Sequence, residues 1–150
     1  MKRTIPSPFG PIVITVEDDA VTRLTWGGGH HEDSDELLDR AAAQLAAYFA
    51  GTLKDFDLPL RIEGSDFQRD VCEAMSAIPF GDTLTYGDIA RQLDAPPQAV
   101  GQACGGNPIP VIVPCHRVLA ANGLGGFSAR GGIETKVALL RHEGAAGLLI

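Results

Sequence analysis

The sequence is poor in cysteine, and the few cysteines that it has are badly placed for disulfides. Its 150 residues include only Cys72, Cys104 and Cys115, an odd number with no CxxC pair. This pattern argues against a disulfide framework. We therefore expect free thiols, which are normal in a reducing cytoplasm.

The sequence also lacks a long hydrophobic run. Beyond the basic start at Lys2 and Arg3, Pro6, Pro8 and Pro11 interrupt the apolar residues. We expect neither a signal peptide nor a membrane-spanning helix, and so a cytoplasmic protein with no membrane partner. The chain is still 45% hydrophobic, which is enough to bury a core in one domain or two small ones.

The sequence also has no excess of positive charge: its net charge is −7. The acidity is uneven: residues 1–84 carry 7 basic and 15 acidic side chains, and residues 85–150 carry 5 basic and 4 acidic ones. Neutralising phosphate charge supplies most non-specific affinity for DNA. A modest DNA-binding face is therefore compatible with the second half and not with the first.

The first part of the chain predicts a small α/β unit, residues 1–64 with its linker. Two β-branched runs at 12–16 and 21–26, four residues apart, indicate a hairpin. A helix capped by Ser34 follows, with Leu37, Ala41, Leu45, Tyr48 and Phe49 on its apolar face. Residues 56–62 suggest one more extended segment. The pair His30 and His31 is too isolated to indicate a metal site.

Residues 65–150 predict a second, mainly helical unit. A helix capped by Ser65 or Asp66 holds Cys72 among apolar residues, where a packing role is favoured. Two short helices then follow, beginning at Thr85 and Gln98 and separated by a tight turn. This is the outline of a DNA-binding helix-turn-helix, although any helical hairpin in a small domain shares it.

The segment from Asn107 to Val118 is the strongest candidate for a functional site. Three prolines stiffen a β-branched run that ends in Cys115, with His116 and Arg117 directly after it. A thiol needs a base or a positive field to react near neutral pH, and a carboxylate such as Glu143 could orient the imidazole. The alternative is a buried cysteine beside a satisfied histidine. Direct contact between the two would require a turn or an intervening water, since neighbours on a strand point to opposite faces.

The end of the chain predicts a glycine-rich loop at 124–132 and a last helix at 133–142. The loop places Phe127 and Ser128 among glycines, which suits a cover over a flat ligand, but it lacks the lysine of a phosphate-binding motif. The residues of this helix that are expected to point inward are Ile133, Val137, Ala138, Leu139 and Leu140.

These motifs resemble the O6-alkylguanine-DNA alkyltransferases, also called methylated-DNA–protein-cysteine methyltransferases. The resemblance is strong over residues 65–144 and general before that. It rests on Phe67-Gln68 with Val71, Ile78-Pro79-Phe80-Gly81, Thr85-Tyr86, Ala99-Val100-Gly101, Asn107-Pro108, Pro114-Cys115-His116-Arg117-Val118 and Leu139-Leu140-Arg141-His142-Glu143-Gly144.

The resemblance implies a fold and a reaction. The fold would be an α/β (α+β) one, with a ribonuclease-H-like hairpin sheet and helix before a mainly helical domain. Cys115 would accept an alkyl group, mainly methyl, from O6-alkylguanine after base flipping, with O4-alkylthymine as a second candidate lesion. The protein would act once, as a monomer on the minor groove of double-stranded DNA, without cofactor or metal.

The resemblance also implies roles for single residues. His116, through a water, would take the thiol proton, Glu143 would orient His116, and Asn107 would brace the turn. Tyr86 would rotate the 3′ phosphate and donate to the leaving guanine. The substrate pocket would include Pro110, Val118, Phe127 and Ser128, and the DNA contacts would include Tyr86, Gln98, Ala99, Gly101 and Arg117.

Departures from the family pattern weaken the DNA-facing part of this prediction. Gln98 stands where the family has an arginine that fills the gap left by the flipped base, and glutamine lacks the charge and reach. The turn at 94–97 is about two residues shorter than the common form. Phe127 replaces a common tyrosine, and Cys72 replaces a common tryptophan. We expect weaker or slower DNA engagement, with the chemistry retained.

Two other classes of function fit parts of the sequence. Alkyltransferase-like proteins bind lesions without removing them, but they lack the acceptor cysteine that is present here as Cys115. A Cys–His hydrolase would need an oxyanion site and repeated turnover. The amount of substrate consumed distinguishes the two classes: transfer to the protein stops at one equivalent, whereas hydrolysis continues.

Overall fold

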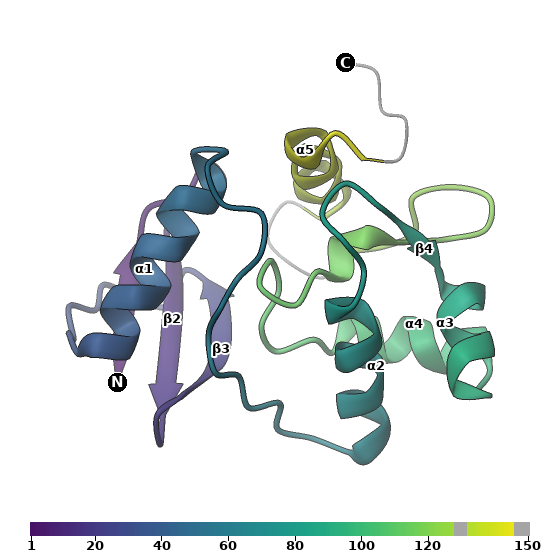
Figure 1. Ribbon diagram of the computed structural model, residues 1–150, viewed down its shortest axis with the longest axis horizontal. Helices are drawn as coiled ribbons and strands as arrows, with labels where there is room; N and C mark the ends of the chain where they lie inside the picture. The colour runs from purple at the N-terminus through teal and green to yellow at the C-terminus, as the bar shows by residue number, and fades with distance from the viewer. Residues whose placement is uncertain (128–131, 146–150) are drawn as a thin grey trace. The chain divides into compact units, whose positions relative to one another are not determined.

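A computed structural model of the chain describes residues 1–127 and 132–145 (Figure 1). The chain forms two compact units, residues 1–63 and 64–150, and each is described by itself. The first combines a sheet with a helix and the second is mainly helical, so the predicted mixed α/β fold is confirmed. Within the described residues, no helix has both the length and the apolar character needed to cross a membrane.

The first unit is built on a three-stranded antiparallel sheet in the order β1-β2-β3. The predicted hairpin is confirmed as β2 (Ile12–Glu17) and β3 (Ala20–Trp26). Asp18 and Asp19 join them with φ of 49° and 62°, as a two-residue type I′ turn requires. Strand β1 (Lys2–Ile5) was not predicted, because its four residues carry two charges and precede a proline-rich loop.

Helix α1 (Glu36–Phe49) packs against β2, with two corrections to the prediction. The cap is Asp35, whose carboxylate accepts a 2.7 Å hydrogen bond from the Leu38 backbone N–H, whereas the Ser34 hydroxyl donates to Asp39. The buried face holds Leu38 in place of Leu37. Both errors have one cause: the helix begins one residue later than predicted.

The expected extended segment at 56–62 is reduced to one bridge between Leu60 and Val21. Val21 donates to the Pro59 carbonyl and accepts from the Arg61 N–H, at 2.8 and 3.0 Å. Pro59 has no N–H to extend the pairing, so the backbone bridge to the sheet edge is short.

The second unit opens with helix α2 (Asp66–Ser76), which Ser65 caps by accepting from the Gln68 backbone N–H. The predicted helix pair is confirmed as α3 (Tyr86–Leu93) and α4 (Pro97–Gly105). Thr85 and Asp88 form a reciprocal capping box at the start of α3. Asp94 ends that helix in the left-handed conformation, and Pro97 begins the next.

A short parallel sheet joins the second unit's two halves. Strand β4 (Leu84–Thr85) pairs with β5 (Val118–Leu119), which follows the 3-10 turn η1 (Cys115–Arg117). Helix α5 (Ile133–Glu143) contacts η1. The prediction that Leu139 and Leu140 point inward is confirmed, because both are buried. The prediction for Ile133 is wrong, since it is 41% exposed. Thr135, Lys136 and Glu143 are buried as well.

Candidate active site

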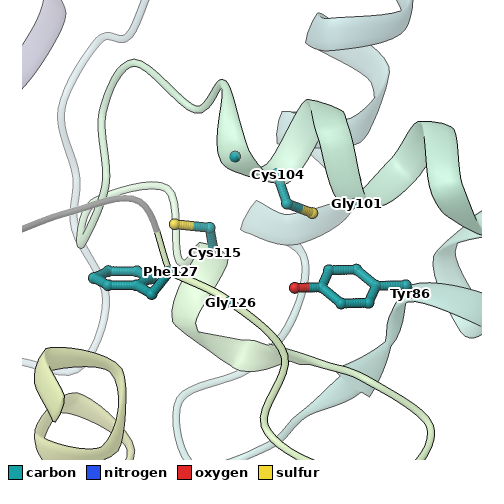
Figure 2. A pocket seen from close by; sticks show the side chains of 7 residues that line it. Tyr86, Gly101, Cys104, Cys115, Gly126 and Phe127 are labelled. Carbon is teal, nitrogen blue, oxygen red and sulfur yellow. The ribbon is translucent and has the colours of Figure 1, made fainter. Parts of the chain in front are cut away.

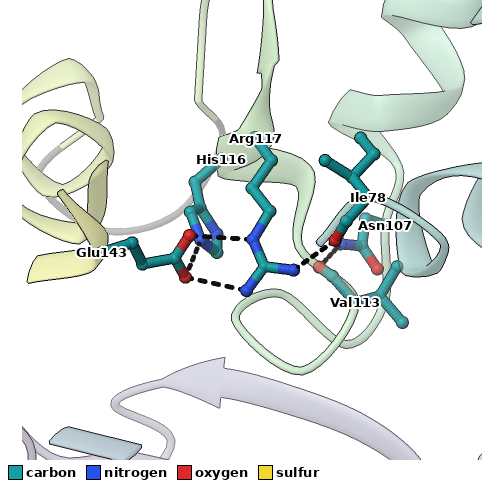
Figure 3. Close-up of polar contacts among 6 residues, drawn as sticks. All are labelled: Ile78, Asn107, Val113, His116, Arg117 and Glu143. Atoms are coloured by element: carbon teal, nitrogen blue, oxygen red, sulfur yellow. Dashed lines mark hydrogen bonds and ion pairs between the residues drawn. The ribbon is translucent and has the colours of Figure 1, made fainter. Parts of the chain in front are cut away.

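Cys115 lies at the start of η1, and the preceding loop is held in place by Asn107. The Asn107 side-chain amide donates to the Val113 carbonyl at 2.8 Å (Figure 3). The Asn107 side-chain oxygen accepts from the Ile109 N–H at 3.0 Å. Both partners belong to the same loop, so one buried side chain fixes the path of the backbone toward Cys115. The predicted brace at Asn107 thus has the hydrogen bonds that it needs.

The loop contains a strained backbone position at Val111. This residue has φ of 73° and is 1% exposed, although left-handed geometry is unfavourable for a β-branched residue. Such positions cost about 1–3 kcal/mol and persist only where the surrounding structure enforces them. The two Asn107 hydrogen bonds flank Val111 and provide that enforcement.

The Cys115 thiol is held in its protonated form in the resting protein. Burial raises the pKa of Cys115 to about 11, opposed by a hydrogen bond from Asn107 and by the charge of Lys136. The thiolate is the nucleophilic form of cysteine. The site therefore requires a group that removes the proton during the reaction.

Three charged or polar side chains form a buried network behind Cys115 (Figure 3). His116 Nε2 lies 2.8 Å from Glu143 Oε2, and Arg117 donates to both Glu143 oxygens at 2.8 and 3.0 Å. Arg117 also donates to the Ile78 carbonyl at 2.6 Å. The sequence prediction that Glu143 orients His116 is consistent with this geometry.

The network determines which nitrogen of His116 can act as a base. A carboxylate paired with arginine only accepts hydrogen bonds, so the proton between His116 and Glu143 belongs to Nε2. Within the described residues, His116 Nδ1 is buried and has no hydrogen-bond partner. Burial lowers the pKa of His116, which the contact with Glu143 partly offsets. The ring is therefore neutral at pH 7, with its lone pair on Nδ1.

Cys115 opens onto a cavity of about 370 Å³ (Figure 2). Its volume lies within the range of small-molecule sites, about 300–1,000 Å³. Figure 2 shows the Tyr86 hydroxyl and both thiols, Cys104 and Cys115, in the cavity, with the Phe127 ring near Cys115. The described lining residues are Tyr86, Gly101, Cys104, Gly105, Cys115, Gly126 and Phe127.

The β4–β5 pair explains why Tyr86 and Cys115 share this cavity. Leu84 and Thr85 pair with Val118 and Leu119, so the start of α3 is tied to the strand that follows η1. Gly125 packs against the Tyr86 ring: a Cβ at this glycine would lie 2.8 Å from the Tyr86 hydroxyl oxygen. Burial raises the pKa of Tyr86, so its hydroxyl is a proton donor at neutral pH.

Comparison with known proteins places both units in one family. Residues 1–62 match the family described as 6-O-methylguanine DNA methyltransferase, ribonuclease-like domain, and residues 66–145 match its DNA binding domain. The chain belongs to the 6-O-methylguanine DNA methyltransferase family.

Individual relatives are similar over nearly the whole chain. The methylated-DNA–protein-cysteine methyltransferase of Methanosarcina acetivorans is 41% identical, over 93% of this chain and 95% of its own length. That of Mycobacterium bovis is 44% identical, over 94% and 90%. The crystal structure of Mycobacterium tuberculosis OGT in complex with DNA is 43% identical, with a TM-score of 0.83 over 95% of this chain and 92% of that one.

The predicted wall of the methyltransferase pocket is only partly observed. Phe127 lines the cavity, and Ser128 lies outside the described residues. Pro110 and Val118 are not among the described lining residues, so their part in the pocket stays a prediction. Val118 is fully buried, and its carbonyl accepts a 2.7 Å hydrogen bond from Lys136. Its side chain therefore belongs to the core of the second unit.

Arg117 also differs from its predicted role in contacting DNA. It is 6% exposed, and its guanidinium is engaged by Glu143 and by the Ile78 carbonyl. Phe80 lies below it, with 5.8 Å between Arg117 Cζ and the ring centroid. A DNA phosphate cannot reach a group enclosed in this way, so we assign Arg117 to the network behind Cys115.

Three of the other predicted DNA contacts, Tyr86, Gln98 and Gly101, lie along an open groove next to the cavity. The groove, about 610 Å³, includes the exposed Gln98 and the half-buried Gly101. Tyr86 and Gly101 line both the groove and the cavity. Ala99 is half-buried beside Gln98 and is not among the described lining residues of either. The remaining described groove residues are Gly87, Pro97, Gln102, Ala120 and Ala121.

Sequence reasoning missed two residues at the site, Cys104 and Lys136. Cys104 lies three residues after Gly101 on α4, a spacing that puts both on one helix face. Lys136 precedes Glu143 by seven residues, which likewise places both on one face of α5. For each residue, the only signal in the sequence was its helical spacing from a residue that had been predicted to belong to the site. Within the described residues, no three His, Cys, Asp or Glu side chains are grouped to bind a metal.

Proposed function

We propose that this protein repairs alkylated DNA by moving an alkyl group from O6 of guanine to Cys115. The observation that carries the proposal is the position of the Cys115 thiol. It opens onto a cavity of about 370 Å³ that also holds the Tyr86 hydroxyl, and the residue after it, His116, contacts Glu143. The names of the relatives, methylated-DNA–protein-cysteine methyltransferases, support the same reaction.

The reaction begins with the thiol proton. It passes through one water to Nδ1 of His116, and Glu143 stabilises the resulting imidazolium through the hydrogen bond from Nε2. The thiolate attacks the alkyl carbon, the S–C bond forms, and the C–O6 bond breaks with its electron pair remaining on guanine. Tyr86 donates its proton to the leaving guanine and regains one from the His116 imidazolium through solvent, so that overall one proton moves from the thiol to guanine.

Access to the alkyl group requires base flipping, because O6 of a stacked guanine is shielded within the duplex. Extrusion costs on the order of a few kcal/mol. The groove that leads to the cavity along α4 fits this task, since Gly101 has open space where a Cβ would be. We place the minor groove of the duplex against α4, with Gln98 at the position vacated by the base.

The product is a thioether, which has no carbonyl for water to attack. A deacylation step of the kind used by Cys–His hydrolases therefore does not exist here. Each protein molecule acts once. Methyl is the main expected group, O6-alkylguanine the main lesion, and O4-alkylthymine a second candidate.

The test is transfer from DNA to a mapped residue. The protein is incubated with a duplex carrying O6-methylguanine, digested, and analysed by peptide mass spectrometry. The proposal expects the methyl group on Cys115, and none with the Cys115→Ser variant. An unlabelled protein, or a label on Cys72 or Cys104, would overturn it.

A further inference from the structure

Phe67-Gln68 is one of the sequence motifs that this chain shares with the family, yet neither residue takes part in the reaction proposed above. Gln68 lies in the first turn of α2, where its backbone N–H donates to the Ser65 hydroxyl at 3.0 Å. Its side chain is half-buried and reaches α4, which packs against α2. A polar group between two helices needs hydrogen-bond partners, and these partners indicate what it does.

The Gln68 amide holds the last turn of α4. Its nitrogen, Nε2, donates to the Ala103 carbonyl at 2.8 Å and lies 3.5 Å from Cys72 Sγ. Because a carbonyl oxygen can only accept hydrogen bonds, this contact determines which end of the amide faces α4. The last four carbonyls of a helix, to which that of Ala103 belongs, lack an α-helical partner. The Gly106 N–H also donates to this carbonyl, at 3.1 Å, so the helix end is tied both to the following turn and to α2.

The oxygen of the same amide faces Gly106, the residue that follows α4. A Cβ at Gly106 would lie 3.3 Å from Gln68 Oε1, which is closer than side chains normally approach. The Gly106 backbone has φ of −92°, so its conformation does not require glycine. The close approach of the Gln68 amide is what favours glycine at this position.

The helix end that Gln68 holds is one wall of the cavity at Cys115. Cys104 and Gly105, in the last turn of α4, line this cavity, and Figure 2 shows the Cys104 thiol in it. The Asn107 N–H donates to the Cys104 carbonyl at 3.2 Å, and the Asn107 side chain braces the loop that leads to Cys115. Hydrogen bonds therefore run from α2 through the end of α4 to the loop that carries the acceptor thiol.

We infer that Gln68 is a positioning residue, which sets the distance between the α4 wall of the cavity and the Cys115 thiol. This role rests on the proposed function, because the wall is the surface against which the flipped guanine is placed. Reacting atoms must approach to about 3–3.5 Å, and a misplacement of about 1 Å can slow a reaction about a hundredfold. Gln68 is not among the described lining residues of the cavity or of the groove, so it acts through the helix that it holds.

The first measurement is single-turnover methyl transfer from a duplex that carries O6-methylguanine, at increasing duplex concentration. Gln68→Met keeps the length of the side chain and loses the donor, whereas Gln68→Glu keeps the shape and places an oxygen against the Ala103 carbonyl. Gln44→Met is the matched control, because the half-buried Gln44 exchanges hydrogen bonds of 3.0 and 2.9 Å with the Asp57 backbone in the first unit. Urea unfolding gives the stability of each variant.

Both Gln68 variants should lower the rate constant at saturating duplex by at least about tenfold, with Gln68→Glu the slower of the two. The duplex concentration at half-saturation should stay close to the wild-type value, because Gln68 does not line the groove. Gln44→Met should keep the wild-type rate constant. Equal rate constants for folded Gln68→Met and Gln44→Met would overturn the inference. A change in half-saturation with an unchanged rate constant would overturn it too.

Gly106→Ala tests the same contact without altering Gln68. The added methyl group displaces the amide from the Ala103 carbonyl, so transfer at saturating duplex should be slower than in the wild type. Gly123→Ala is the control, since no atom lies within 4 Å of its added Cβ. If Gln68→Met does not fold, Gly106→Ala decides, and a wild-type rate constant in this variant would contradict the inference.

Hydrogen exchange of residues 103–107 needs no DNA, so this inference and the proposed function can fail independently. Exchange there should be faster in Gln68→Met and unchanged in Gln44→Met, because loss of the anchor favours local opening of the helix end. Faster exchange in a protein that accepts no methyl group from DNA would contradict the repair function alone. Unchanged exchange, or normal transfer by Gln68→Met, would contradict the role of Gln68 alone.

Discussion

Glu143 Oε2 lies 2.8 Å from His116 Nε2, in a region where both side chains are 0% exposed. The contact directs the lone pair of the imidazole, on Nδ1, away from the carboxylate. Glu143, on the last helix, thereby determines which ring nitrogen of His116 carries the proton. Arg117 forms an ion pair with the same carboxylate. The base, His116, therefore belongs to a buried network in the core of the second unit.

Arg117 should therefore matter for stability. Removing one partner of a buried ion pair leaves the other charge uncompensated, at a cost of roughly 3–5 kcal/mol. We expect Arg117→Met to lower the free energy of urea unfolding by about that amount. Arg91→Met, which removes an exposed ion pair with Asp88, should have a far smaller effect. Similar unfolding energies for the two variants would contradict the assignment of Arg117 to the core.

His116 should make stability depend on pH. Its pKa is lowered in the folded protein, whereas the unfolded chain has the ordinary value of about 6.5. Below that pH the unfolded state binds a proton that the native state refuses, so stability falls as pH falls. The slope approaches about 1.4 kcal/mol per pH unit. Urea unfolding between pH 5 and 8 measures it. The slope should decrease in His116→Gln and persist in His30→Gln, whose side chain is exposed; equal slopes in both variants would refute the explanation.

Gly125 offers a test of how Tyr86 is positioned. Alanine at this position would have its Cβ 2.8 Å from the Tyr86 hydroxyl oxygen and 3.0 Å from Cε2, at a backbone φ of 72°. We expect Gly125→Ala to slow methyl transfer at least tenfold and to lower stability by about 1–2 kcal/mol. At Gly123 no atom lies within 4 Å of the added Cβ, so Gly123→Ala is the matched control. Single-turnover rates that are the same for both variants would argue against packing of Tyr86 on this loop.

Substitution of Gln98 should be able to increase the rate at which the protein engages and repairs DNA. Arginine at this position would fill the space of the flipped base with a longer, charged side chain. We expect Gln98→Arg to raise the single-turnover rate severalfold. Gln92→Arg adds the same charge on α3, at an exposed residue that does not line the groove. Equal or slower transfer in the Gln98 variant, or the same acceleration in both, would contradict the proposed role.

The local features of this protein were largely readable from its sequence. The hairpin, α2, α3 and α4 follow from periodicity, turn residues and capping residues such as Ser65 and Thr85, all of which are short-range signals. The proline-stiffened approach to Cys115 was readable for the same reason. The family resemblance then implied roles for His116 and Glu143, which are 27 residues apart.

Features that depend on packing between distant segments could not be predicted. Nothing local in Arg117 distinguishes a phosphate ligand from the buried partner of Glu143. The seven-residue spacing between Lys136 and Glu143 indicates a shared helix face but not that this face is buried. Only the tertiary structure, which brings α5 against η1, changes these assignments. Strand β1 was missed because its signal comes from pairing with β2. Its own composition carries little of that signal.

The most direct test of the central claim, that Cys115 is consumed in a single transfer, is the stoichiometry of repair. A fixed amount of protein is mixed with a large excess of duplex containing O6-methylguanine, and repaired guanine is quantified over time. The account predicts a plateau at one repaired base per protein molecule, with an equal amount of methylated Cys115. Repair that continues past one equivalent, with Cys115 unmodified, would contradict it.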